Sequence, residues 1–129
     1  MRCPAFFVNK DGTYTLDGKY TAQTLLKGHD AQNENCTLLP NGQLVINRGF
    51  VWDGPSGPAI DTANTLIPSA MHDALYGIIS EQHLPAKFTR DLRNAADRSY
   101  RDSLKTWGVS KWRRMLHYRG VNLFGWLHI

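Results

Sequence analysis

Short apolar runs alternate with turn residues in the first half of the chain. Three dipeptides join an acid or an amide to glycine, which tolerates positive φ: Asp11-Gly12, Asp17-Gly18 and Asn41-Gly42. Apolar and β-branched residues flank the second dipeptide at 14–16 and 20–21, and the third at 38–39 and 44–46. This pattern predicts two hairpins in a small antiparallel β-sheet.

From Leu66 onward the apolar residues recur at the spacing of a helix. The first stripe consists of Ile67, Ala70, Met71, Ala74, Leu75 and Ile78, with Pro68 expected in the first turn. A second helix is predicted to open at Pro85 and to end at Gly108. Its apolar stripe consists of Phe88, Leu92, Ala95, Ala96, Tyr100 and Leu104.

Ser110 is placed to cap a third helix that carries Trp112, Leu116 and Val121. The sequence therefore predicts an α+β fold. A small antiparallel β-sheet with hairpins in the amino-terminal half is expected to pack with about three helices in the carboxyl-terminal half. Because no linker or repeat interrupts the pattern, residues 1–129 are predicted to form a single domain.

The composition is that of a globular chain. Hydrophobic residues make up 42% and charged residues 20% of the sequence, which argues against disorder. Cys3 and Cys36 form neither a disulfide framework nor a zinc pattern, so we expect free thiols in a reducing cytoplasm. The sequence shows no secretory signal and no apolar run of ~20 residues, so no membrane span is predicted.

The net charge of +4 is unevenly placed, because the third helix gathers four cations: Lys111, Arg113, Arg114 and Arg119. They can attract a phosphate-bearing partner, although a solvated helix face is the simpler interpretation. No specific nucleic-acid motif accompanies them. The apolar carboxyl terminus from Val121 to Ile129 is expected to pack on the sheet, with a homo-oligomer interface or a membrane contact as alternatives.

An ordered loop is predicted to join the two halves. Residues 50–58 hold two glycines and two prolines, which forbid regular structure, yet Phe50 and Trp52 are too apolar for a loose loop. Asp53 lies before a glycine, where its carboxylate either points at a ligand or forms an Asx-turn. Trp52 and Ser56 are candidates for contact with a substrate.

The predicted helices carry the remaining candidate chemistry. Adjacent His72 and Asp73 lie off the core stripe, and an imidazole beside a carboxylate suits a divalent metal or an acid–base pair. Alternatively, Asp73 pairs with an arginine and His72 is a half-buried polar residue. Arg93 and Asp97 share a helix face at the edge of the second stripe, where an ordinary ion pair would contribute ~0.3–0.5 kcal/mol.

The order of these residues along the chain resembles the pattern of a family of small proteins from tailed phages and prophages. The family is known as the domain of unknown function numbered thirteen fifty-three. The similarity runs from Gly49 to Gly125. It rests on Gly49-Phe50, Asp53, Ser56, Pro58, His72, Asp73, Leu75, Tyr76, Arg93, Ala96-Asp97, Tyr100, Gly108-Val109 and Tyr118-x-Gly120. The longer turn around Ser56 departs from the family pattern and leaves the role of that serine open. The resemblance implies a phage origin and an α+β fold, and it implies no activity.

The working hypothesis is a metal-dependent hydrolase of a phosphoester or nucleotide-type substrate, such as a signal of host defence in the cytoplasm of the infected cell. Its divalent metal (Mg, Mn or Zn) would be held by Asp53, His72, Asp73 and Asp97. Arg93 would bind a phosphoryl oxygen, and Tyr76 would donate a hydrogen bond.

Two other hypotheses explain the same residues without turnover. In the first, the polar residues bind a small anionic ligand, with Trp52 stacking on it. In the second, the protein is a structural or interaction protein of the phage, and the charged residues form a buried network that fixes the helices.

Overall fold

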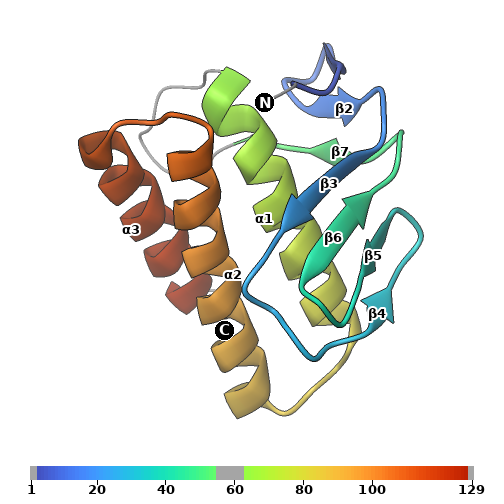
Figure 1. The fold of residues 1–129 in the computed structure, drawn as a ribbon, viewed down its shortest axis with the longest axis vertical. Coiled ribbons are helices and arrows are strands. Elements are labelled where there is room, and N and C mark those ends of the chain that lie inside the picture. The colour runs from blue at the N-terminus through green and yellow to red at the C-terminus, as the bar shows by residue number, and fades with distance from the viewer. Residues whose placement is uncertain (1–2, 55–62, 128–129) are drawn as a thin grey trace.

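The computed structural model describes residues 3–54 and 63–127. Figure 1 shows the strands of the amino-terminal half gathered on one side of the molecule and three helices of the carboxyl-terminal half on the other. The predicted α+β fold is therefore confirmed. Within the described helices, none combines the length and the apolar character that a membrane crossing requires.

The strands form two small antiparallel sheets, where the sequence predicted one. The first has the order β1-β2-β7 and consists of β1 (Phe6–Val8), β2 (Tyr14–Leu16) and β7 (Val51–Trp52). The second has the order β3-β6-β5-β4 and consists of β3 (Tyr20–Gln23), β6 (Gln43–Ile46), β5 (Cys36–Leu38) and β4 (Ala31–Gln32).

The hairpin predicted at Asn41-Gly42 is confirmed, since Leu38 of β5 pairs with Leu44 of β6 across this turn. Gly42 has a φ of +89°, and a Cβ there would lie 2.6 Å from the carbonyl oxygen of Thr24. The position therefore requires glycine for both its backbone conformation and its close contact. Asp11-Gly12 likewise turns the chain from β1 into β2.

The hairpin predicted at Asp17-Gly18 is wrong, because β2 and β3 on either side of it belong to different sheets. The amide of Asp17 donates to the carbonyl of Ala5 at 2.8 Å, and the chain then leaves the first sheet. Tyr20 of β3 pairs with Ile46 of β6 instead. A turn dipeptide shows that the chain changes direction there, but distant sequence decides which strands pair.

The helices are α1 (Ala63–Glu81), α2 (Ala86–Thr106) and α3 (Lys111–Leu127). Their predicted boundaries hold where capping residues mark them. Pro85 precedes α2, and Gly108 ends it with a φ of +79°. The hydroxyl of Ser110 accepts the amide of Arg113 at 3.4 Å and so caps α3. Pro68, expected in a first turn, lies inside α1 because that helix begins earlier than predicted.

The stripe predicted for α1 forms the centre of the core, since its members are at most 2% exposed: Ile67, Ala70, Met71, Ala74, Leu75 and Ile78. Because these side chains recur on one face, α1 contacts β6, β7 and α2, and α3 packs on α2.

Cys36 is buried in the same core, whereas Cys3 is exposed, and both thiols are free.

Three aromatic or apolar residues assigned to helix stripes lie on the surface instead. Phe88 is 59% exposed and follows Lys87 in the first turn of α2. Trp112 and Leu116 are 67% and 45% exposed. They share the outer face of α3, and the residues that face inward are His117 and Val121. Of the predicted α3 stripe, Val121 is therefore confirmed as buried, and the placement of Trp112 and Leu116 is wrong.

Candidate functional site

Asp97 of α2 is a buried acceptor at which side chains of all three helices meet. Nε2–H of His72 and the hydroxyl of Tyr76, both on α1, donate to its Oδ1, each at 2.7 Å. The side-chain amide of Asn122 on α3 donates to its Oδ2 at 3.0 Å. We call His72, Tyr76, Asp97 and Asn122 the polar centre.

The helix period explains how the polar centre forms. His72 and Tyr76 lie four residues apart on α1, so they stand one turn above the other beside the buried stripe. Asp97 directly follows the buried Ala96, and its side chain is 2% exposed. A buried carboxylate is tolerated when donors satisfy it, and here three donors from two neighbouring helices do so.

The surroundings of His72 favour its protonated form. Burial alone disfavours a charged ring, but the favourable interactions with Asp73 and Asp97 outweigh burial and raise the pKa of His72 above its ordinary value. Burial and the contact with Asp97 raise the pKa of Tyr76, so the phenol remains a donor. The centre thus contains one carboxylate, one ring able to exchange a proton, and two fixed donors.

The second ring nitrogen of His72 faces Asp73. Nδ1 lies 3.7 Å from Oδ1 of Asp73, which is within the range of an ion pair and beyond that of a hydrogen bond. The side chain of Asp73 is 33% exposed, whereas that of His72 is 7% exposed. Nδ1 therefore faces the more exposed of the two carboxylates that flank the ring.

Arg93 covers the outer side of the centre. Its guanidinium carbon lies 5.4 Å from the centroid of the Tyr76 ring, a cation–π geometry. The simpler interpretation, an ion pair between Arg93 and Asp97, is not found among the described side chains, because three other donors occupy that carboxylate. Nε of Arg93 is buried and has no hydrogen-bond partner within the described part of the chain.

A second polar pair adjoins the centre. The rings of His72 and Tyr100 lie 5.2 Å apart, and the Tyr100 hydroxyl lies 3.1 Å from Nδ1 of His117 on α3. The sequence analysis missed His117 and Asn122. The sequence signal for His117 is phase, because it lies four residues before the buried Val121, and Asn122 directly follows that valine at the edge of the buried face.

Trp52 and Ser56 were both predicted to contact a substrate, and the structure describes only the first of them. Trp52 is 2% exposed, donates from Nε1 to the hydroxyl of Ser69 at 3.1 Å, and packs against three rings in the core. The prediction that it stacks on a ligand is therefore wrong: the large apolar ring is more stable buried than lining a site. Ser56 lies outside the described residues.

The residues predicted to hold a metal are only partly brought together. His72 contacts Asp73 and Asp97, but no hydrogen bond or ion pair joins Asp53 to any of them in residues 3–54 and 63–127, and Asp53 is exposed after β7. Among those residues, no group of three or more His, Cys, Asp or Glu side chains is placed to hold a metal ion. The hydrogen-bonded imidazole and carboxylate are His72 and Asp97, whereas the sequence predicted a pair between His72 and the adjacent Asp73.

The polar centre is small and largely filled by its own side chains. Two cavities of about 530 Å³ and about 170 Å³ lie elsewhere, and none of the four centre residues lines either of them. Access to His72 is through the partly exposed Asp73, Tyr76 and Arg93.

A family model described as "Protein of unknown function (DUF1353)" matches residues 32–121. The matched range begins in β4, earlier than the similarity seen in the sequence, and so includes β5, β6 and β7 as well as α1 and α2. It contains His72, Asp73, Tyr76, Arg93 and Asp97. No curated protein and no solved structure matches the chain.

Proposed function

This chain belongs to the DUF1353 family, whose description assigns no activity, and we propose that it is a hydrolase in which His72 and Asp97 form the acid–base pair. One observation carries the proposal. Asp97, with its oxygens filled by three donors, holds Nε2 of His72 at 2.7 Å, and Nδ1 of the same ring faces the partly exposed Asp73. An imidazole oriented by a buried carboxylate is the usual arrangement of a catalytic histidine.

The geometry supports a simple proton transfer. Nδ1 of His72 accepts a proton from water as the water oxygen bonds to the substrate phosphorus, and the bond to the leaving oxygen breaks. The same nitrogen then returns the proton to that oxygen, so the reaction consumes one water and leaves the protein unchanged. Asp97 stabilises the imidazolium that forms, in line with the raised pKa of His72, and the ring acts as a base only after it has lost its own Nδ1 proton.

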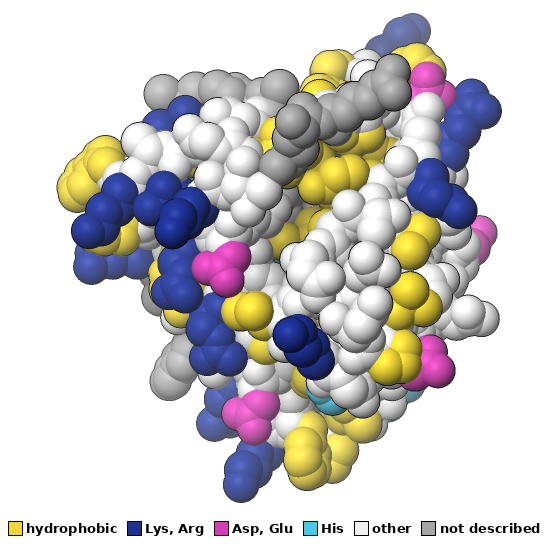
Figure 2. All heavy atoms as spheres, in the orientation of Figure 1, with side chains coloured by type: hydrophobic (Ala, Val, Ile, Leu, Met, Phe, Trp, Pro, Cys, Tyr) yellow, Lys and Arg dark blue, Asp and Glu magenta, His cyan; other side chains and the backbone are white. Residues whose placement is uncertain are grey.

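The charge around the centre favours an anionic substrate. The buried Nε–H of Arg93 has no partner in the described chain, and a phosphoryl oxygen is an acceptor that suits it. Figure 2 shows Lys and Arg side chains gathered along the side formed by α2 and α3, which attracts polyanions toward these helices. We therefore propose a phosphoester or nucleotide, and, if the protein is of phage origin, a nucleotide signal of the infected cell.

A panel of linear and cyclic nucleotides tests the proposal, with and without Mn²⁺ or Mg²⁺ and with chromatographic separation of the products. We expect turnover that His72→Gln reduces by roughly 10²-fold or more. The matched control is His29→Gln, which changes an exposed histidine far along the chain and should retain the activity. No turnover of any nucleotide by the folded wild-type protein would overturn the proposal.

A second candidate is a protein that binds the same anion without converting it. The observation that favours it is the low exposure of His72 and Asp97, at 7% and 2% of their side chains. Under this candidate, equilibrium dialysis recovers a stoichiometric nucleotide intact, and His72→Gln weakens binding. Folded variants of the centre that neither bind nor convert any nucleotide would instead assign the polar centre to holding the helices together.

A further inference from the structure

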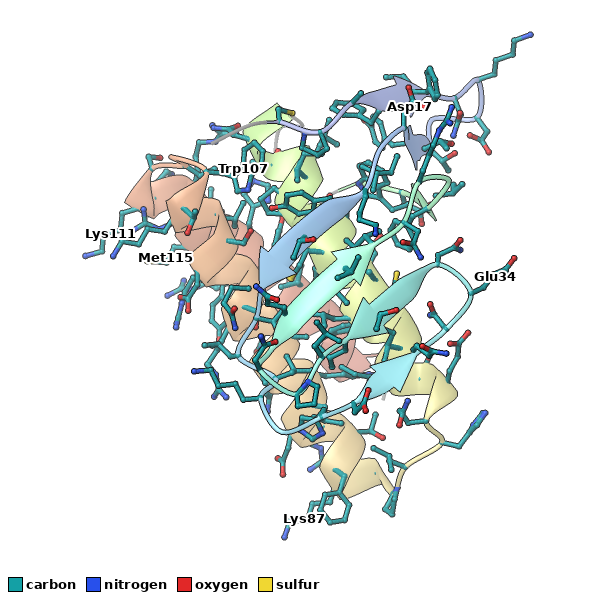
Figure 3. All side chains as sticks on the ribbon, turned by 45° about the vertical axis from the view of Figure 1, so that its right-hand side comes forward. Asp17, Glu34, Lys87, Trp107, Lys111 and Met115 are labelled. Carbon is teal, nitrogen blue, oxygen red and sulfur yellow. The ribbon has the colours of Figure 1, made fainter. Side chains whose placement is uncertain are left out.

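A groove of about 530 Å³ lies between β3 and α2, and none of the four residues of the polar centre lines it. Hydrogen bonds bridge it at two places. Nε1–H of Trp107 donates to the hydroxyl of Tyr20 at 3.1 Å, and the amide of Leu25 donates to the hydroxyl of Ser99 at 2.9 Å. Figure 3 shows Trp107 at the carboxyl end of α2, the end that faces the start of β3.

One wall of the groove is the free edge of a sheet. β3 is the first strand in the order β3-β6-β5-β4, so only one of its sides is paired. The amide of Thr24 points inward to Gly42 at 2.9 Å, and the amide of the next residue, Leu25, points outward to Ser99. Successive residues of a strand alternate in this way, so Thr21 and Gln23 also point their N–H and C=O groups into the groove.

These outward groups are without a partner in the described protein. Outside the pairing of β3 with β6, neither Thr21 nor Gln23 makes a backbone hydrogen bond within residues 3–54 and 63–127. Ser99 therefore occupies, at Leu25, the position that a carbonyl of an added strand would take. The corresponding position is open at Gln23, two residues before Leu25, and at Thr21, four residues before it.

The opposite wall leaves room for a chain and selects its side chains. Ser103 and Thr106 are small and lie between the two bridges on α2. Asp102 brings a carboxylate to the groove, and its only described ion pair is with Arg101 at 3.7 Å on the exposed surface. The carboxylate disfavours a phosphate and favours a cation, so the groove suits a ligand different from that of the polar centre.

We propose that this groove binds a short extended peptide segment, which adds to the edge of β3 over Thr21 to Gln23. Main-chain amides of the peptide complete the hydrogen bonds of these two residues, as in other cases of strand addition. A basic side chain of the peptide pairs with Asp102, and an apolar side chain packs against the Trp107 and Tyr20 rings. The volume lies within the ordinary range of about 300–1,000 Å³ for ligand sites.

The test is a titration of the ¹⁵N-labelled full chain with acetyl-Val-Lys-Val-amide, followed by amide shifts. We expect saturable shifts of the Thr21 and Gln23 amides. A peptide with methylated main-chain nitrogens should bind roughly ten-fold more weakly, since it cannot donate the ladder hydrogen bonds. Absence of shifts at these amides, or equal binding of the methylated peptide, would overturn the proposal.

Two variants distinguish a loss of peptide binding at this site from a general change in the protein's structure. Thr21→Pro removes one outward donor, and proline is tolerated where a strand's N–H faces away from the sheet, so the fold should persist while binding falls. Asp102→Asn should abolish the preference for acetyl-Val-Lys-Val-amide over acetyl-Val-Glu-Val-amide. Asp91→Asn, at another exposed acid of α2, is the matched control and should retain it. An unchanged preference in Asp102→Asn would contradict the assigned role of that carboxylate.

Discussion

Tyr76 and His72 donate to the same oxygen of Asp97, each over 2.7 Å, although that aspartate follows them by more than twenty residues on another helix. The shared acceptor means that neither donor can be removed without changing the other's surroundings. It also couples the position of the candidate catalytic ring to the packing of α1 on α2. The following predictions use this coupling.

Asp97→Asn should destabilise the protein by roughly 1–3 kcal/mol, because an amide presents two N–H groups where three donors now meet a carboxylate. Urea unfolding measures the change. Asp91→Asn, on the exposed side of the same helix, should stay within about 0.5 kcal/mol of wild type. Equal effects of the two substitutions would contradict the view that the polar centre holds α1, α2 and α3 together.

Tyr76→Phe should cost roughly 1.5–3 kcal/mol, the usual contribution of a hydrogen bond to a charged group, while the ring beneath Arg93 remains. If His72 is catalytic, the variant should also lower the turnover rate, since one oxygen of Asp97 loses a donor. Thermal and urea unfolding measure the first effect. Tyr118→Phe, which also leaves a ring beneath an arginine, is the control.

Stability should fall as the pH rises through the neutral range. Because the folded-state pKa of His72 is raised, the folded protein binds its proton more tightly than the unfolded chain does. This contribution is fully present below the ordinary histidine pKa of about 6.5 and is lost as the pH passes the raised value. Unfolding free energies measured across that window should show the decline in wild type and in His29→Gln, but not in His72→Gln. A wild-type profile that rises over the same window would refute this assignment.

Arg93→Met should change stability little, because removal of a buried N–H that has no acceptor in the described chain offsets the loss of the cation–π contact with Tyr76. Affinity for inorganic phosphate or a nucleotide should fall at the same time. Calorimetry measures both quantities. Arg90→Met, an exposed position on the same helix, should change neither, and a loss of stability in Arg93→Met alone would show that the arginine has a partner.

The two cysteines should differ in reactivity. Burial raises the pKa of the Cys36 thiol to about 11, so almost no thiolate forms at neutral pH, whereas Cys3 is exposed. A thiol reagent should label one equivalent in the folded protein and a second only in denaturant. Cys3→Ser should then show no rapid labelling, and rapid labelling of Cys36 would mean that the core opens readily.

The sequence predicted local structure better than it predicted partners. Pro85, Gly108 and Ser110 mark helix ends through their own backbone chemistry, and the stripe of α1 follows from periodicity alone. By contrast, Asp17-Gly18 shows the limit of a local signal, since strand pairing was decided by Tyr20 and Ile46. Periodicity also does not fix which apolar residues of α3 face inward.

The residues of the candidate site also differ in how far the sequence predicted their roles. His72, Tyr76 and Asp97 were identified from residue type and spacing, because imidazole, phenol and carboxylate beside a core stripe are unusual. Asn122 was missed because an amide has no distinctive sequence pattern, and its role depends on how α3 packs on α2. Trp52 was misassigned because a loop tryptophan can line a site or anchor the loop, and only the packing of its ring decides.

The helix α2 also determines how the molecule behaves toward other copies of itself. An unpaired strand edge can template aggregation, and the second sheet has its edges at β3 and β4. β4 contains only two residues, and the longer β3 is faced by α2. Conditions or substitutions that break the contact between Trp107 and Tyr20 would open the longer edge, which the groove now leaves accessible to a short segment, to a whole strand of another copy. On heating, the protein is therefore expected to aggregate when α2 separates from β3, before the core around α1 is exposed.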